Sequence, residues 1–205
     1  MKKIDWETYK DIYPDRYIKK SPFDDMVSSY ISMLNFLSQM QIVILEIGGG
    51  INGSISEEYS KYNHCYLLDP FITNCPKEYI DKVNWDVNFK FDLIVCRGAF
   101  NYLSINEIKS IVGLLKPKGL FIFNTFSSPS EGTRTYEKDG LHAGYETTIL
   151  EKNILKHELH RDNGDIISHD IIFYTSSEIE GFFEHSLITK ESNNNSDYYI
   201  IRKTK

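Results

Sequence analysis

A glycine-rich segment directly after an apolar run constrains the fold of this chain more than any other feature. The run from Gln41 to Ile47 is rich in β-branched side chains, which is typical of a parallel strand covered on both faces. Gly48, Gly49 and Gly50 follow it, and a short helix is predicted from about 54 to 62. Glycine is needed where a chain turns tightly or lets other atoms approach its backbone. This order of strand, glycine turn and helix predicts an α/β chain.

Strands and helices are predicted to alternate along the first 125 residues. The predicted strands are 41–47, 65–68, 83–87, 91–96 and 120–123, and the predicted helices are 24–40, 54–62, 76–82 and 104–115. Ser104 and Glu107 have the spacing of a capping box at the start of the last of these helices. Short connections between alternating elements favour right-handed βαβ units and a parallel sheet with helices on both faces.

The last third of the chain has a different pattern. Two β-rich segments, 147–159 and 165–174, are separated by Asn163-Gly164, a pair that favours the positive φ angles of a tight hairpin turn. Thr175 is predicted to cap a helix that runs to about His185, and two strands, 187–190 and 198–202, are predicted to pair antiparallel.

The predicted fold class is therefore α/β, with a Rossmann-like doubly wound sheet that is mostly parallel and has an antiparallel last strand. An N-terminal helical lid and an inserted β-hairpin after strand five complete it. Residues 1–205 are interpreted as a single domain with four parts: a helical lead (1–40), a core (41–125), an insert with the hairpin (126–175), and a final helix and strand pair (176–205).

Charge and cysteine usage exclude several kinds of partner. The 205 residues carry a formal net charge of −6, so the chain lacks the basic character expected of a nucleic-acid binder. Cys65, Cys75 and Cys96 are odd in number and lack metal-ligand spacing, which favours a reducing cytoplasm. No apolar stretch approaches the roughly 18 residues of a membrane span, and residues 1–6 do not look like a secretory signal. We expect a cytoplasmic protein without nucleic-acid or membrane partners.

The glycine segment is compatible with two nucleotide-derived cofactors. Residues 48–53 match the pattern G-x-G-x-x-G, and Asp69 lies 19 residues beyond Gly50, which would suit a dinucleotide in an oxidoreductase. Glu46 argues against that cofactor, because its carboxylate would repel a pyrophosphate but suits a ligand with an ammonium group and a sulfonium. The long helical lead and the shortage of chain for a substrate domain point in the same direction.

These motifs, in this order over residues 24–205, resemble class I S-adenosylmethionine-dependent methyltransferases. The resemblance rests on the glycine segment, on Asp69 after strand two, on the strand from Phe91 to Val95, and on the turn from Leu114 to Leu120. It implies that S-adenosylmethionine is the cofactor and S-adenosylhomocysteine the product, with no metal. The chain departs from the family pattern at Asn52, which stands where the third glycine is usual.

The resemblance also implies roles for ten residues. Glu46 and the backbone of Gly48, Gly49 and Gly50 would border the methionine moiety. Asp69 would accept the ribose hydroxyls, and Pro70, Asp86 and Val87 would lie near the adenine, while Arg97 and Gly98 would lie under the sulfonium end. Two alternatives stay open: Asp69 before Pro70 as a simple turn former, and Asp86 as an ordinary loop carboxylate.

Methyl transfer is a displacement at carbon, so the main tasks of the protein are to position the nucleophile and to exclude water. A base helps when the acceptor is a hydroxyl or a protonated amine. Tyr102, His142 and Tyr145 are the candidate catalytic residues, and Arg97 and Asn101 are further candidates for acceptor contact. The helical lead contains four aromatic residues: Trp6, Tyr9, Tyr13 and Tyr17. They either form a lid over an apolar substrate or pack the lead against the core.

The acceptor is predicted to be a small molecule. Residues 97–102 lack the Asn-Pro-Pro-Tyr signature of enzymes that methylate amino groups of nucleic acids. The insert is similar to that of small sugar-amine N-methyltransferases, which implies N- or O-methylation of a sugar or natural-product intermediate and a homodimer through the hairpin. Three alternatives remain: a protein or nucleic-acid acceptor, an NAD(P)-dependent oxidoreductase, and a non-catalytic S-adenosylmethionine-binding partner protein.

Overall fold

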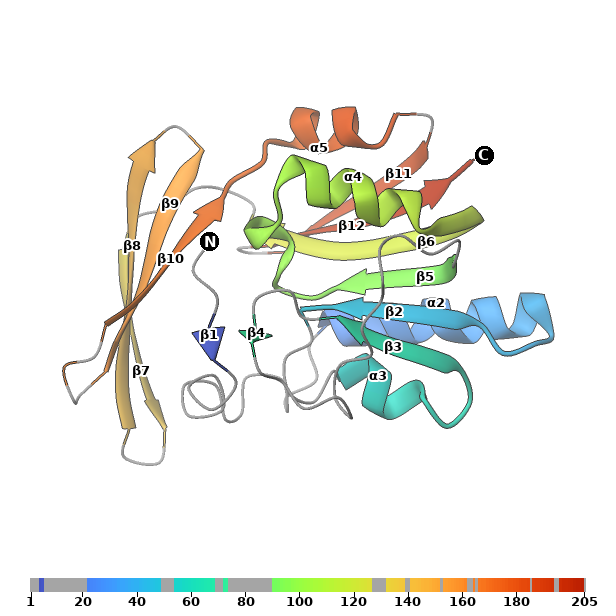
Figure 1. Ribbon diagram of the computed structural model, residues 1–205, viewed down its shortest axis with the longest axis horizontal. Coiled ribbons are helices and arrows are strands. Elements are labelled where there is room, and N and C mark those ends of the chain that lie inside the picture. The colour runs from blue at the N-terminus through green and yellow to red at the C-terminus, as the bar shows by residue number, and fades with distance from the viewer. Residues whose placement is uncertain are drawn as a thin grey trace.

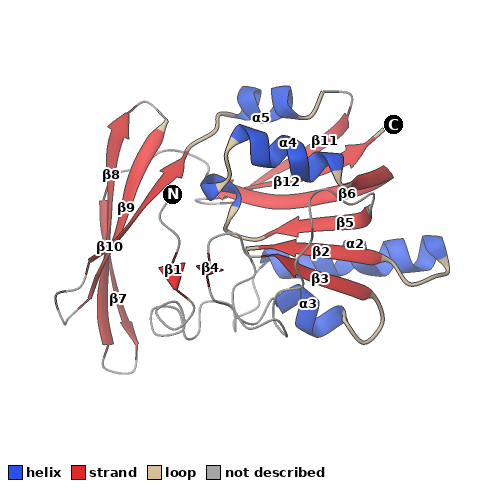
Figure 2. Ribbon diagram, in the orientation of Figure 1, coloured by secondary structure: helices blue, strands red, loops and turns tan. Residues whose placement is uncertain are grey.

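The computed structural model shows two main β-sheets, one flanked by helices and one without them (Figures 1 and 2). It describes residues 4–5, 22–48, 54–68, 72–73, 90–126, 132–138, 141–151, 153–161, 164, 166–184, 186–193 and 196–204. None of the helices in these ranges is long and apolar enough to cross a membrane.

The larger sheet has six strands in the order β11-β12-β6-β5-β2-β3. They are β2 (Val43–Ile47), β3 (His64–Leu68), β5 (Phe91–Cys96), β6 (Leu115–Phe126), β11 (Ser186–Asn193) and β12 (Ser196–Lys203). β2, β3, β5 and β6 are parallel, and β12 pairs antiparallel with both β6 and β11. The predicted mostly parallel sheet with an antiparallel last strand is confirmed. The predicted strand 83–87 lies outside the described residues.

Both faces of this sheet are buried, because alternate side chains of each strand point to opposite sides. On one face Ile44, Leu93 and Ile122 pack with α2 (Pro22–Ser38) and α3 (Ser54–Tyr59). On the other face Leu45, Ile94 and Phe121 pack with α4 (Ile105–Gly113) and α5 (Ser176–Phe182). Continuous apolar strands are therefore explained by helices on both sides, as predicted.

Helix ends follow the capping chemistry of the sequence. Ser104 and Glu107 form a complete capping box at the start of α4, and Thr175 and Glu178 form another at the start of α5. The predicted end of the first of these helices at Leu115 is wrong: α4 ends at Gly113, and β6 begins at Leu115. The turn expected between Leu114 and Leu120 is an irregularity at the start of β6, where Lys118 has a positive φ of 67° and the pairing with β5 shifts register.

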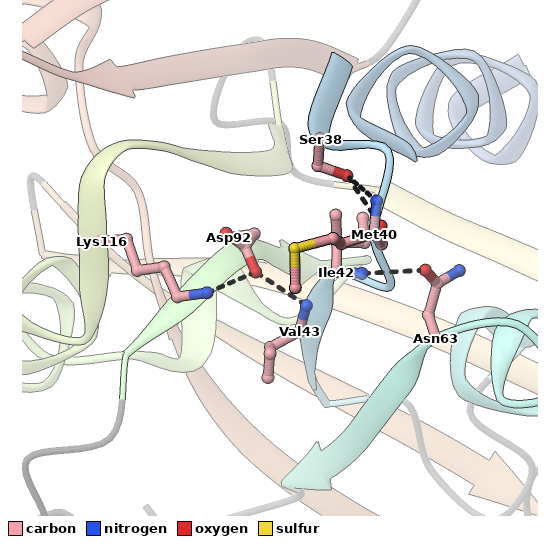
Figure 3. A network of polar contacts seen from close by, with 7 residues as sticks. All are labelled: Ser38, Met40, Ile42, Val43, Asn63, Asp92 and Lys116. Atoms are coloured by element: carbon pink, nitrogen blue, oxygen red, sulfur yellow. Dashed lines mark hydrogen bonds and ion pairs between the residues drawn. The ribbon is translucent and has the colours of Figure 1, made fainter. Parts of the chain in front are cut away.

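Side-chain hydrogen bonds fix the amino-terminal edge of the sheet (Figure 3). The carboxylate of Asp92 in β5 accepts from the backbone N–H of Val43 at 2.8 Å and from Lys116 Nζ at 2.7 Å. The Asn63 side-chain oxygen accepts from the N–H of Ile42 at 3.2 Å. Since buried N–H groups need partners, these two side chains satisfy the start of β2 and link it to both neighbouring strands. This edge is structural, and the opposite edge holds the candidate site.

The smaller sheet is an insert between β6 and α5, and it is larger than the predicted hairpin. It has four antiparallel strands in the order β10-β9-β8-β7, with bounds β7 (Gly132–Lys138), β8 (Leu141–Glu151), β9 (Ile154–Arg161) and β10 (Ile166–Ile172). The β-rich segment predicted over 147–159 is divided between β8, which ends at Glu151, and β9, which begins at Ile154, and β7 was not predicted. We call this the insert sheet; it lies toward the carboxyl ends of β5 and β6 (Figure 1).

The N-terminal lead departs from the predicted helix. Ile4–Asp5 is a short strand, β1, which pairs in parallel with β4 (Ile72–Thr73). The predicted helix over 24–40 is present as α2, but only one of its apolar faces is in the core. Val27 and Ile31 are buried, whereas Met33 and Leu37 are exposed. The aromatic residues at 6, 9, 13 and 17 lie outside the described residues.

Candidate functional site

Glu46 and Gly48 stand at the carboxyl end of β2, where the parallel strands share one edge. Glu46 is 1% exposed and pairs in register with Val95 of β5 and Leu67 of β3. Burial of a carboxylate is costly unless polar partners offset it, so such groups concentrate at functional sites. The structure places this acid where ligands of open α/β sheets bind, outside the carboxyl ends of the strands.

Gly48 is required by both conformation and packing. Its φ is +71°, and its N–H donates to the carbonyl of Leu68 at 2.9 Å. A Cβ atom at this position would lie 2.3 Å from the Cβ of Ala99 in the loop after β5. The first glycine of the segment therefore lets the ends of three neighbouring strands approach one another, as a tight turn at this edge predicts.

The side chain of Glu46 lies on the face of the sheet that α2 covers, and its charge affects the thiol of Cys65. Cys65 shares this face, because it pairs in register with Ile44, two residues before Glu46. Burial, and to a lesser extent the negative charge of Glu46, raises the pKa of Cys65 to about 12. The thiol therefore stays protonated at neutral pH and acts as an apolar neighbour of the acid, not as a nucleophile.

A buried ion pair joins α2 to the same edge. Arg97, the first residue after β5, lies 3.2 Å from Asp24 in the first turn of α2, measured from guanidinium nitrogen to carboxylate oxygen, and both side chains are largely buried. Next to it, the N–H of Gly98 donates to the Asn124 side-chain oxygen at 2.7 Å, and Gly98 has a φ of +64°. Two predicted site residues, Arg97 and Gly98, are thus held in place from α2 and β6.

Asn101 does not offer its side chain to an acceptor, contrary to the sequence interpretation. It is 4% exposed. Its oxygen accepts from Thr125 Oγ1 at 2.9 Å and from the N–H of Phe126 at 3.3 Å, and its nitrogen donates to the carbonyl of Ile172 at 2.7 Å. These partners stand where the chain leaves β6 for the insert and where it returns from β10. Asn101 therefore anchors both ends of the insert to the loop after β5.

Tyr102 belongs to the same loop, in a short 3₁₀ helix from Phe100 to Tyr102, and is half-buried. Leu103 next to it is fixed from the insert side, because Tyr174 donates its hydroxyl to the Leu103 carbonyl at 2.7 Å. The backbone of His142 and Tyr145 lies on β8 of the insert sheet, and their side chains lie outside the described part of the structure. The structure brings Glu46, Gly48, Arg97 and Gly98 together and leaves the catalytic role of Tyr102 as a prediction.

Six of the predicted cofactor residues lie outside the described residues: Gly49, Gly50, Asp69, Pro70, Asp86 and Val87. In the part of the chain that the structure describes, no group of three or more His, Cys, Asp and Glu side chains could hold a metal ion.

Sequence reasoning missed Asp24 as a member of this edge. Asp24 lies three residues before Val27 and seven before Ile31, so helical periodicity puts it on the buried face of α2. A carboxylate on an apolar face needs a partner, and that signal was available in the sequence. The identity of the partner, Arg97, was not, because it depends on how α2 packs against β5.

Comparison of the sequence with known proteins gives one partial match. No family model matches the chain. One stretch is 42% identical over 55 residues to the malonyl-[acyl-carrier protein] O-methyltransferase of Porphyromonas gingivalis, and it covers 25% of this chain but only 22% of that protein. The matched stretch thus spans less than a quarter of that relative.

Two solved structures are similar over nearly the whole chain. One is an S-adenosylmethionine-dependent methyltransferase from Clostridium acetobutylicum, with a TM-score of 0.68 and 16% identity over 98% of this chain and 99% of that chain. Another is CalS10, an amino pentose methyltransferase from Micromonospora echinaspora with the cofactor bound, with a TM-score of 0.62 and 15% identity over 96% of each chain. The chain has the Rossmann-like fold of the S-adenosylmethionine-dependent methyltransferases.

Proposed function

We propose that this chain is a cytoplasmic S-adenosylmethionine-dependent methyltransferase that transfers a methyl group to nitrogen or oxygen of a small-molecule acceptor. One observation carries the proposal: the buried carboxylate of Glu46 stands beside Gly48 at the carboxyl edge of a sheet whose fold is similar to that of these enzymes. A fold supports many functions, so the site residues must supply the argument.

The residues of this edge fit S-adenosylmethionine better than a dinucleotide. The amino-acid part of S-adenosylmethionine has an ammonium group that can donate hydrogen bonds to a buried carboxylate such as Glu46, and charge-assisted bonds of this kind are the strong ones. A pyrophosphate at the same place would meet a like charge in a buried setting. We assign Glu46, Gly48, Gly49 and Gly50 to the methionine moiety.

The remaining cofactor assignments follow from the resemblance. Asp69 is proposed for the ribose hydroxyls; Pro70, Asp86 and Val87 are proposed for the adenine side; and Arg97 and Gly98 are proposed for the sulfonium end. Arg97 follows β5 next to the β2 edge, and its pairing with Asp24 offsets the guanidinium charge there, which reduces repulsion of the sulfonium. When bound, S-adenosylmethionine supplies an electrophilic methyl group, and the protein must orient the acceptor and keep water away.

Tyr102, His142 and Tyr145 are the proposed groups for removing a proton from the acceptor. They come from the loop after β5 and from β8 of the insert sheet, and Asn101 ties that loop to the insert. We propose that the acceptor binds between this loop and the insert sheet. A sugar or natural-product intermediate is supported by the likeness to CalS10, which acts on an amino pentose.

Calorimetry tests the cofactor. We expect the wild type to bind S-adenosylmethionine and S-adenosylhomocysteine, and Glu46→Gln to weaken binding by roughly 10- to 100-fold, as expected for loss of a hydrogen bond to a charged group. Glu184→Gln, an exposed acid just after α5, is the matched control and should leave affinity unchanged. Absence of S-adenosylmethionine binding by the wild type, or tighter binding of a nicotinamide cofactor, would contradict the proposal.

Turnover tests the acceptor class. Methyl transfer from labelled S-adenosylmethionine to a panel of amino sugars and their nucleotide conjugates should give labelled product. Cofactor binding with label found only in protein or nucleic acid would favour a macromolecular acceptor. Cofactor binding with no transfer to any acceptor class would favour a non-catalytic partner protein.

A further inference from the structure

Asn124 contacts the candidate site from β6, and the sequence analysis assigned it no role. It lies near the carboxyl end of that strand, where its backbone pairs with Tyr198 of β12, and its side chain is half-buried. Its side-chain oxygen accepts from the N–H of Gly98 at 2.7 Å. Because a backbone N–H can only donate, the oxygen end of the amide must face Gly98. β6 therefore holds the backbone of the loop after β5 at Gly98.

This hydrogen bond sets the direction of the peptide group between Arg97 and Gly98. In a planar trans peptide the N–H and the C=O point in opposite directions. β5 lies between β6 and β2 in the sheet (Figure 1). Since the Gly98 N–H points to β6, the carbonyl of Arg97 points to the other side, toward the carboxyl end of β2. The negative end of this peptide dipole is thus directed to the edge that holds Glu46 and Gly48.

Gly98 alone would not keep this direction. Its φ is +64°, and a Cβ atom at this position would meet no atom of the described residues within 4 Å. Glycine populates positive and negative φ about equally, so packing does not select one orientation of the peptide. The loop is fixed again two residues later, where the ring of Phe100 stacks on Phe123 with centroids 3.9 Å apart. Ahead of that point, the hydrogen bond to Asn124 determines where the carbonyl of Arg97 points.

A purely structural role does not account for this contact. Gly98 is exposed, so water can satisfy its N–H without help from a side chain. Asn101 shows the contrast, because it is buried and uses both ends of its amide, as a structural anchor does. The side chain of Asn124 is half-buried and makes one hydrogen bond among the described residues. That bond orients an exposed peptide group and does not satisfy a buried one.

A carbonyl oxygen directed this way suits the sulfonium of S-adenosylmethionine. The positive sulfur polarises the C–H bonds of its methyl group, and polarised C–H groups form weak hydrogen bonds with carbonyl oxygens. A dipole that is already oriented needs no reorganisation when the ligand binds. We propose that Asn124 is a positioning residue that directs the carbonyl of Arg97 toward the sulfonium methyl group. This inference rests on the proposed function, since it requires S-adenosylmethionine at the carboxyl end of β2.

Calorimetry with the cofactor and its product separates this role from folding, because S-adenosylhomocysteine lacks the sulfonium and its methyl group. Asn124→Ala should weaken binding of S-adenosylmethionine by roughly 3- to 10-fold, as for one or two C–H···O contacts, and leave affinity for S-adenosylhomocysteine unchanged. Asn124→Asp keeps an oxygen for the Gly98 N–H and should keep the wild-type ratio of the two affinities or increase it. Asn153→Ala, which loses one 3.3 Å contact with Glu178, is the matched control and should change neither affinity.

NMR of S-adenosylmethionine labelled with carbon-13 in its methyl group gives a second readout that does not depend on affinity. A C–H···O contact moves the proton resonance of the methyl group downfield. At saturating ligand, the bound methyl signal should therefore lie further upfield in Asn124→Ala than in the wild type and in Asn153→Ala.

The possible results distinguish the positioning role from the proposed function. Equal weakening of both ligands in Asn124→Ala, or an affinity ratio and methyl resonance that stay unchanged, would overturn the role of Asn124 and leave the proposed function standing. The same holds if Asn124→Asp loses the affinity ratio to the extent that Asn124→Ala does. A wild type that binds neither ligand would overturn the proposed function and this inference together.

Discussion

At the scale of single residues, Gly48 and Gly98 show two reasons why this edge requires glycine: the backbone conformation and the close packing of neighbouring atoms. Both have positive φ, +71° and +64°, but an added Cβ would collide with Ala99 only at Gly48. Gly98→Ala should cost about 1–2 kcal/mol of unfolding free energy from backbone strain alone. Gly48→Ala should cost about 1–3 kcal/mol more, because the ends of β2 and β5 must separate. Urea denaturation measures both, and equal losses would show that packing against Ala99 is unimportant.

Cys65 provides a pH-dependent test at the same scale. Its pKa is about 12 in the folded protein against 9.0 for an unperturbed thiol, so folding favours the protonated form. The resulting contribution to stability is fully present below pH 9 and is lost as pH rises toward 12. At pH 9, iodoacetamide should label the Cys65 peptide slowly in native protein and rapidly in urea, as read by mass spectrometry. Similar rates in both states would contradict the assigned burial.

At the scale of elements, the attachment of the insert sheet depends on Asn101. Asn101→Ala removes three hydrogen bonds that join the loop after β5 to both ends of the insert, worth about 1 kcal/mol each. We expect a large fall in kcat/KM for the acceptor with little change in S-adenosylmethionine affinity, because Glu46 and Gly48 are untouched. Asn153→Ala is the control: it loses one 3.3 Å contact to Glu178 and should retain turnover. A marked loss of S-adenosylmethionine affinity in Asn101→Ala would show that the hydrogen bonds of Asn101 also support the cofactor site.

The elements also show what the sequence can and cannot specify. Both capping boxes were predictable, because their side chains act within a few residues of one another. The parallel core was predictable from apolar runs such as 91–96, which need cover on both faces. The insert sheet was underestimated, since strand pairing between distant segments leaves little local signal, and β7 was missed. The two faces of α2 share one periodicity, so sequence could not tell which apolar residues face the core and which face outward.

The candidate site was predictable from sequence only in part. Glu46, Gly48, Arg97 and Gly98 follow or end strands whose carboxyl ends meet at one edge, so their proximity was predictable from sequence, while their roles toward a cofactor, which the resemblance implies, stay predictions. The role of Asn101 could not be found, because its three partners lie on segments that only the folded chain brings together. A polar residue in a loop near a site is equally suited to ligand contact and to anchoring, and only burial separates the two.

At the scale of the whole molecule, cofactor binding should stabilise the entire chain. The proposed contacts connect β2, the loop after β5 and, through the Arg97–Asp24 pair, α2, so a ligand there binds only the folded state. At a concentration 100 times its Kd, S-adenosylhomocysteine should add about 2.7 kcal/mol, which raises Tm by roughly 5–10 °C for a chain of this size. Asp24→Asn should lower the Tm of the free protein and also reduce this shift, because it removes the partner that holds Arg97 at the site. A reduced Tm with an undiminished ligand shift would show that the ion pair supports folding and has no part in binding.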